Sequence, residues 1–133
     1  MGASLSSPEA TNQISVKVIF VVDDDEEIGL LLTQLIHQET PHHAWHHTTG
    51  SQALQAISTH TPHLLILDYD LPDMNGLELH DRLHALERLR NVPTLLISAI
   101  KPPMQEVRKR AITFLAKPLD LMELLRAIRK LLG

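Results

Sequence analysis

Acidic side chains stand at two places in this sequence where a run of aliphatic residues ends. The stretch "LLILDYDLPDMNG" (64–76) delivers Asp68 at the end of such a run, with Asp70 two residues later. A second run, "KVIFVV" (17–22), is followed by five consecutive acidic residues, 23–27. Two carboxylates about 4 Å apart repel each other by roughly 4 kcal/mol at an effective dielectric constant near 20. Such a cluster requires a proton or a cation, and carboxylate oxygens with open water positions suit Mg²⁺.

A hydroxyl group and an ammonium group accompany two further aliphatic runs. Ser98 ends "PTLLIS" (93–98), and Lys117 directly follows "AITFLA" (111–116). Each feature alone has a structural explanation, since acidic residues complement the dipole of a helix N-terminus and a serine or a Lys-Pro pair is common in turns. The recurrence of chemically useful groups at the same point of four different runs favours a shared site.

The elements that must position these groups alternate along the chain. Short aliphatic or β-branched runs predict strands, and apolar residues spaced at i, i+3, i+4 and i+7 predict helices. The expected strands are 17–22, 43–48, 63–68, 93–98 and 111–116. The expected helices are 28–36, 51–59, about 77–89, a short part of 99–110, and 121–132.

This alternation predicts an α/β fold, a doubly wound sheet of five parallel strands with helices on both faces. In such a sheet, ligands bind outside the carboxyl ends of the strands, where the strand order reverses. Four of the five expected strand ends carry a carboxylate, a hydroxyl or an ammonium group suited to one site.

Length and composition set further bounds on fold and function. The 133 residues suffice for one domain, which we place at 14–133 after a flexible leader at 1–13. The chain has no cysteine, which excludes disulfides and thiol chemistry. A net charge of −4 argues against nucleic-acid binding. No apolar run approaches the ~20 residues that span a membrane, and we expect a cytoplasmic protein.

The motifs together resemble the receiver domain of response regulators in two-component signalling, over about residues 16–133. The matching segments are "IFVVDDDEEI", "LLILDYDLPDMNGLEL", "TLLISA" and "FLAKPL". The resemblance implies a flavodoxin-like (βα)5 fold with strand order 2-1-3-4-5. It also implies a protein that catalyses only its own phosphorylation and dephosphorylation, and is not otherwise an enzyme.

The resemblance assigns a role to each site residue. Asp68 would accept a phosphoryl group from the phosphohistidine of a sensor histidine kinase or histidine phosphotransfer protein. Mg²⁺ would be bound by Asp24, Asp68 and the main-chain carbonyl of Asp70, with Asp23 acting through water. Lys117 and the Ser98 hydroxyl would contact phosphoryl oxygens, and the Lys117–Pro118 peptide would be cis.

The same resemblance implies a switch and an output. Movement of Ser98 would open space for Phe114 to turn inward, which would change the 99–125 surface that a downstream effector reads. Only 18 residues separate Ser98 from Lys117, fewer than is usual in the family. The missing length falls in the fourth helix, which also carries Pro102 and Pro103.

Two other functions fit parts of the sequence. The segment "LLILDYD" also fits the nucleophile motif of haloacid-dehalogenase-like phosphohydrolases, with Asp70 as acid/base. That family places its second acidic motif after the lysine, whereas here the acidic pair comes first. A degenerate receiver that serves only as a binding module is the other alternative, and the complete set of acidic, hydroxyl and lysine residues argues against it.

The nine histidines suggest metal binding but have simpler explanations. Because side chains alternate along a strand, "HHAWHH" (42–47) is better explained as a polar edge strand. His80 and His84, at i and i+4, are close enough on a helix to bind a metal adventitiously, but we expect them on a solvent-exposed face.

Overall fold

A computed structural model describes residues 15–133, so the leader predicted at 1–13 lies outside the described part. Strands and helices alternate throughout, as the sequence predicts. Their bounds, with the short 3-10 helix η1, are β2 (Val18–Val22), α2 (Glu26–Glu39), β3 (His43–His47), α3 (Gly50–Ala56), β4 (Leu64–Asp68), α4 (Gly76–His84), η1 (Glu87–Leu89), β5 (Thr94–Ser98), α5 (Met104–Lys109), β6 (Thr113–Ala116) and α6 (Leu121–Leu132).

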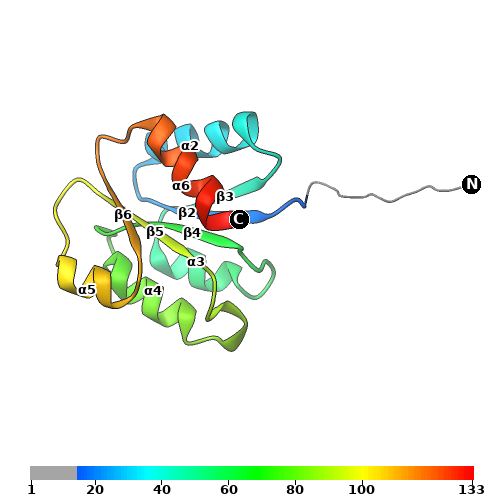
Figure 1. The fold of residues 1–133 in the computed structure, drawn as a ribbon. Coiled ribbons are helices and arrows are strands. Elements are labelled where there is room, and N and C mark those ends of the chain that lie inside the picture. The colour runs from blue at the N-terminus through cyan, green and yellow to red at the C-terminus, as the bar shows by residue number, and fades with distance from the viewer. Residues whose placement is uncertain (1–14) are drawn as a thin grey trace, which may run out of the picture.

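The five strands form one parallel sheet in the order β3-β2-β4-β5-β6. In chain order this is 2-1-3-4-5, so the predicted fold is confirmed. Helices α2 and α6 cover one face of the sheet and α3, α4 and α5 cover the other (Figure 1). Every residue of β4 and β5 is buried, because both faces of a doubly wound sheet are covered.

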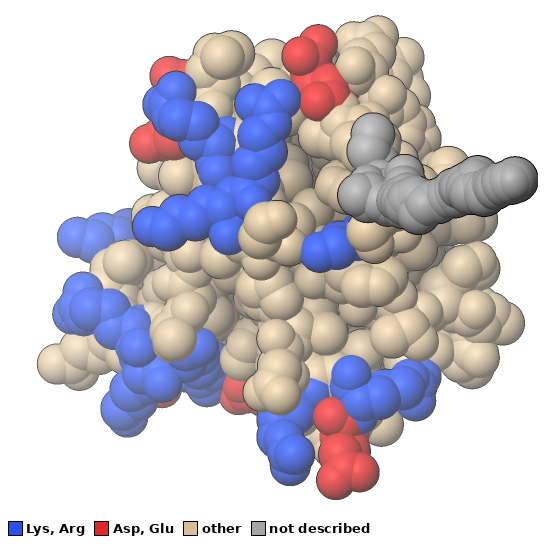
Figure 2. Space-filling view, turned by 45° about the vertical axis from the view of Figure 1, so that its right-hand side comes forward, with Lys and Arg blue, Asp and Glu red and all other residues tan. Residues whose placement is uncertain are grey.

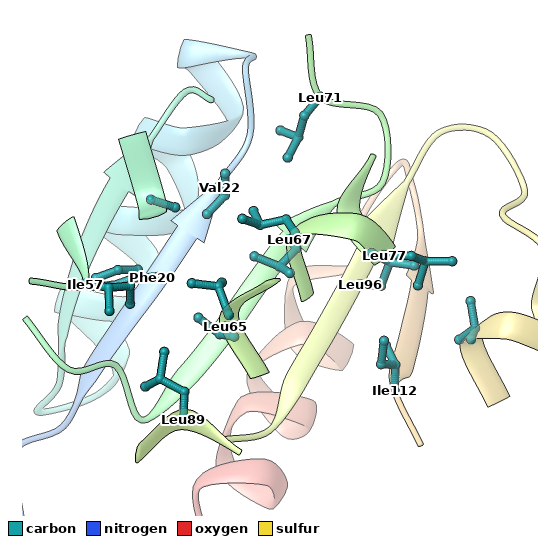
Figure 3. Close-up of a cluster of buried hydrophobic side chains, with 14 residues drawn as sticks. Phe20, Val22, Ile57, Leu65, Leu67, Leu71, Leu77, Leu89, Leu96 and Ile112 are labelled. Atoms are coloured by element: carbon teal, nitrogen blue, oxygen red, sulfur yellow. The ribbon is translucent and has the colours of Figure 1, made fainter. Parts of the chain in front are cut away.

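Each face of the sheet has its own hydrophobic core. Toward α3, α4 and α5, side chains such as Phe20, Leu65 and Leu96 form a cluster of aliphatic residues, several of them labelled in Figure 3. Toward α2 and α6, the alternate residues of the same strands, such as Ile66, pack against Leu32 and other helical residues. This alternation fixes the strand register, because a shift by one residue would exchange the two faces.

Several expected elements differ in their bounds: the helix expected over 51–59 spans Gly50–Ala56, and two further differences have a cause in the backbone conformation. The helix expected over 77–89 ends at His84, and η1 follows as a separate turn, because the extended conformation of Leu86 (ψ 126°) interrupts the helix. The strand expected at 111–116 begins only at Thr113, because Ala111 has a positive φ of 56° and closes the turn after α5.

The expectation that His80 and His84 lie on an exposed face is wrong. His80 is only 8% exposed, and its ring stacks on that of His84 with centroids 3.9 Å apart. Nδ1 of His84 lies 2.8 Å from the His80 carbonyl oxygen and Nε2 lies 2.7 Å from that of Val92. Both nitrogens of His84 therefore face carbonyl oxygens, so neither is directed at a metal shared with His80.

The segment rich in histidine forms β3, an edge strand of the sheet as predicted. Trp45 on this strand is 44% exposed and packs against the ring of His60. No helix within residues 15–133 is long and apolar enough to cross a membrane.

Charge is unevenly distributed over the molecule. Residues 101–133 carry eight Lys or Arg and three Asp or Glu, although the whole chain has a net charge of −4. Basic side chains outnumber acidic ones on the face shown in Figure 2. The negative charge is concentrated elsewhere, above all in the acidic run 23–27 that follows β2.

Candidate functional site

The turn from β2 into α2 presents the first group of carboxylates. Asp23 is fully buried at the end of β2, whereas Asp24 is exposed. Asp25 is the N-cap of α2, and its side chain accepts hydrogen bonds from the N–H groups of Glu27 and Ile28. Asp23 and Asp24 therefore stand at the site, Asp25 caps helix α2, and Glu26 and Glu27 lie in the first turn of that helix, where acidic residues complement the helix dipole.

The neighbouring strand β4 delivers Asp68 to the same edge. Asp68 is its last residue and is 4% exposed. The chain returns close to it, because the Gly76 N–H donates to the Tyr69 carbonyl at 2.8 Å and a Cβ on Gly76 would come within 2.6 Å of the Asp68 carbonyl oxygen. Glycine at 76 thus permits the tight loop that starts α4 beside the end of the strand.

Lys117 joins the two carboxylates. Its Nζ donates to Asp23 Oδ2 at 2.8 Å and to Asp68 Oδ2 at 3.0 Å. Its main-chain N–H donates to the Ser98 carbonyl at 2.8 Å, which ties the end of β6 to that of β5. The Lys117–Pro118 peptide is cis, as predicted. Three residues that are far apart in sequence thus meet at the carboxyl edge of the sheet.

Burial and charge together set the electrostatics of this cluster. Burial, reinforced by the charge of Asp23, raises the pKa of Asp68 although hydrogen bonds from Lys117 and the Asp70 N–H act in the opposite direction. Burial alone would lower the pKa of Lys117, but its hydrogen bonds to Asp23 and Asp68 raise it instead. Lys117 therefore stays charged, while one cation faces two carboxylates and leaves an excess of negative charge.

The donor set fits a hard divalent cation. One oxygen each from Asp23, Asp24 and Asp68 lie within 4.8 Å of one another. These three residues line a cavity of about 250 Å³ together with Asp25, Asp70, Ala99, Ile100 and Lys117. Three clustered carboxylates that open to solvent on one side match the oxygen ligands and retained waters that Mg²⁺ prefers.

Of the other predicted site residues, Asp70 lies at this cavity, whereas Ser98 and Phe114 lie at a second one. The N–H of Asp70 donates to Asp68 Oδ1 at 3.1 Å. Ser98 is buried, and its Oγ accepts from the Ile100 N–H at 3.1 Å rather than contacting the carboxylates. Ser98 instead lines a second cavity of about 430 Å³ that it shares with Phe114, which is partly buried. Ser98 and Phe114 thus border the same cavity, and the switch between them stays a prediction.

Two contacts that position the acidic loops are not evident from sequence motifs. Asp73 accepts hydrogen bonds from Gly50 and Ser51 at the start of α3. His46 contacts the main-chain carbonyl of Asp23. The glycine at position 29, inside a helix, is the sequence signal for the second contact, because His46 packs where its side chain would be.

Comparison with known proteins identifies the class to which this fold and site belong. Residues 19–129 match the family described as the response regulator receiver domain, and the chain belongs to that family. It is therefore a signalling module of two-component phosphorelays, and the phosphohydrolase and the binding-only receiver are not favoured.

Particular relatives match over nearly their whole length. Sporulation initiation phosphotransferase F of Bacillus subtilis is 30% identical over 117 residues, which cover 86% of this chain and 92% of the relative. The polar-differentiation response regulator DivK of Brucella ovis is 28% identical over 120 residues, covering 88% and 97%. A CheY-like receiver domain protein of Methanospirillum hungatei has a TM-score of 0.81 at 25% identity, covering 89% and 94%.

Proposed function

We propose that Asp68 is the phosphoacceptor of this receiver domain. A carboxylate oxygen of Asp68 would attack the phosphorus atom of a phosphohistidine, forming a P–O bond as the P–N bond breaks and its electron pair returns to the imidazole. The observation that carries the proposal is the position of Asp68, buried at the end of β4 yet lining the acidic cavity. Lys117, whose Nζ lies 3.0 Å from Asp68 Oδ2, would stabilise charge on the phosphoryl oxygens.

We also propose Mg²⁺ as the cofactor, held by Asp24, Asp68 and the main-chain carbonyl of Asp70, with Asp23 acting through water. The clustering of the three carboxylates supports this assignment, as does the use of acidic residues by receiver domains to bind Mg²⁺. Bound there, the ion would offset negative charge on the transferring phosphoryl group.

Phosphorylation by a small phosphodonor tests both assignments. With acetyl phosphate and Mg²⁺, intact-protein mass spectrometry should detect one phosphoryl group on the wild type and none on Asp68→Asn. Asp70→Asn is the matched control, because its main-chain carbonyl is unchanged and labelling should persist. Labelling of Asp68→Asn would place the acceptor elsewhere, and undiminished labelling in excess EDTA would remove Mg²⁺ from the proposal.

The switch is proposed to couple Ser98 to Phe114 and the 99–125 surface. Ser98 and Phe114 line one cavity, so displacement of the serine toward a phosphoryl group would change the space that the aromatic ring can occupy. Beryllofluoride with Mg²⁺ mimics the phosphorylated state and should shift the amide resonances of residues 98–118. The absence of such shifts, when the signals of Asp68 and Asp24 do move, would refute the switch while leaving the acceptor in place.

The proposed partners are a sensor histidine kinase or histidine phosphotransfer protein and a downstream effector. Helix α2 supports a docking surface for the phosphodonor, because Leu30 and Leu31 are 58% and 46% exposed. Leu30 also lines a cavity beside Glu26 and Glu27, next to the acidic site. Leu30→Ala should slow transfer from a phosphorylated phosphotransfer protein but leave labelling by acetyl phosphate unchanged. A cytoplasmic location stays a prediction.

A further inference from the structure

His46, on the edge strand β3, contacts the acidic loop that follows β2. Its Nε2 lies 2.8 Å from the main-chain carbonyl oxygen of Asp23. A carbonyl oxygen only accepts hydrogen bonds, so Nε2 must carry the proton and donate. The carbonyl of the next residue, His47, accepts from the Asp23 N–H at 3.0 Å. The end of β3 therefore holds both main-chain polar groups of Asp23.

The imidazole of His46 occupies a place on helix α2 that only a glycine leaves free. A Cβ atom added to Gly29 would overlap the ring atoms of His46. Gly29 is buried in the first half of α2, where a glycine costs about 0.5–1 kcal/mol relative to alanine. The helix thus carries a locally unfavourable residue at the one position where the ring of His46 needs the space.

The hydrogen bond from His46 acts on Asp24 through the peptide between Asp23 and Asp24. The carbonyl of Asp23 and the N–H of Asp24 belong to one planar unit, so holding the carbonyl fixes the plane from which Asp24 continues. The Asp23 carboxylate is held separately, by Lys117 and the Asp25 N–H. Within residues 15–133, the exposed Asp24 carboxylate has no hydrogen bond that would orient it in a similar way.

We propose that His46 is a positioning residue for the metal site: its Nε2–H, accommodated by Gly29, orients the Asp23–Asp24 peptide and so keeps Asp24 within reach of the cation. The inference rests on the proposed Mg²⁺ site formed by Asp23, Asp24 and Asp68. Removal of a group that orients a metal ligand without itself contacting the metal typically weakens metal binding by about 10–100-fold.

Two substitutions of His46 separate the hydrogen bond from packing. His46→Leu removes the donor at similar volume, whereas His46→Gln retains an N–H at about the reach of Nε2. Measured by calorimetry with Mg²⁺ alone, affinity should fall about tenfold in His46→Leu and be largely restored in His46→Gln. His43→Leu, an exposed histidine of the same strand, should bind Mg²⁺ like the wild type. Equal affinity in His46→Leu and wild type, or equal loss in both His46 variants, overturns the proposal.

Gly29→Ala tests the same idea from helix α2. It leaves every ligand in place and introduces a residue that helices favour, but it displaces the His46 ring. Mg²⁺ affinity should fall as in His46→Leu, and unchanged affinity contradicts the proposal. The wild type also gives a direct measurement that needs no variant, because ¹⁵N NMR must find the His46 proton on Nε2.

These measurements keep two possible failures apart. If the wild type does not bind Mg²⁺ at Asp24, the proposed metal site itself is wrong. If the wild type binds Mg²⁺ but the His46 and Gly29 variants bind it equally well, only the role of His46 is wrong. Urea unfolding of each variant identifies any that do not fold. If a His46 variant does not fold, the Mg²⁺ affinity of Gly29→Ala and the His46 tautomer in the wild type test the proposal instead.

Discussion

Asp73 and Ser51 join the loop after β4 to the start of helix α3. Oδ2 of Asp73 accepts from the Ser51 N–H at 2.9 Å and from the Ser51 Oγ at 2.8 Å, while Oδ1 accepts from the Gly50 N–H at 3.0 Å. The loop that begins at Asp68 and carries Asp70 is therefore attached to a helix that follows a different strand. An acidic residue at a helix N-terminus also interacts favourably with the helix dipole.

Asp73→Ala should lower the free energy of unfolding by about 1 kcal/mol, the usual cost of losing a capping carboxylate. Slight burial by itself would raise the pKa of Asp73, but hydrogen bonds from Ser51 and Gly50 outweigh it and lower that pKa. A lowered pKa means that this stabilisation is complete above the ordinary pKa of about 4 and is lost as the pH falls below it. Urea unfolding of wild type and variant at several pH values measures the difference. Gln34→Ala, an exposed position on α2, should change little.

Lys117→Ala should destabilise the protein by about 3 kcal/mol in the absence of divalent cations. The substitution leaves the buried carboxylates of Asp23 and Asp68 without their cation, and breaking a buried ion pair on one side costs about this much. Added Mg²⁺ should restore more stability to the variant than to the wild type, since both cations offset the same charge. Urea unfolding with and without Mg²⁺ provides the measurement.

Lys130→Ala removes an exposed lysine of α6 and serves as the control for that experiment. It should alter the free energy of unfolding by less than about 0.5 kcal/mol. If the two lysine variants lose equal stability, Lys117 does not neutralise a buried cluster.

His42 should make the fold sensitive to mild acid. Its Nδ1 accepts a hydrogen bond from the Lys17 N–H at 3.1 Å, which requires an unprotonated Nδ1. Burial, together with the charges of Lys17 and His63, lowers the pKa of His42. Because the folded state resists protonation, stability is complete above the ordinary histidine pKa of about 6.5 and declines as the pH falls below it.

His42→Asn keeps an acceptor near the position of Nδ1 but does not titrate. Between pH 7.5 and 5.5, the wild type should therefore lose more unfolding free energy than the variant. The difference should be about 1 kcal/mol or less, the value of one hydrogen bond. Parallel loss in both proteins would show that other groups cause the acid sensitivity.

Arg110 should control the ionisation of Asp81 on helix α4. Nε and one terminal nitrogen of Arg110 lie 2.8 Å from the two carboxylate oxygens of Asp81. The Arg110 hydrogen bonds lower the pKa of Asp81 to about 2. The pair stabilises the fold above pH about 4, and this contribution disappears as the pH falls to about 2.

In Arg110→Ala, the pKa of Asp81 should return toward its ordinary value, as followed by the ¹³C shift of its carboxyl carbon. The stability change at pH 7 should stay below about 1 kcal/mol, because the Asp81 side chain is 51% exposed. Arg82→Ala, which breaks a different pair with Glu78, should leave the Asp81 titration unchanged.

The layered fold and the gathering of Asp23, Asp68 and Lys117 were predictable from the sequence. Buried parallel strands have continuous aliphatic runs, and their carboxyl ends meet at one edge. Local sequence patterns were sufficient to predict this site, because the topology of the sheet brings the three side chains together once the strands are identified.

Contacts between distant side chains were not predictable in the same way. His80 lies beside Leu79 and Leu83 on one helical face, a position typical of the core, but its polar ring suggested exposure. Its burial depends on His84, Asp81 and the packing of the chain around Val92. The role of His46 likewise depends on the register of β3 beside β2, and only Gly29 hints at it.

Helix α5, with six residues from Met104 to Lys109, has a consequence for how a signal could leave the domain. At 1.5 Å per residue it is about 9 Å long, and a helix this short has no stability of its own. It is held by the buried Val107 and by the Arg110–Asp81 pair at its end. We therefore expect its amides to exchange with solvent before those of α2 or α6. A signal that passes through this side of the domain would then depend on the formation and unfolding of helix α5, and not on a rigid-body movement of that helix.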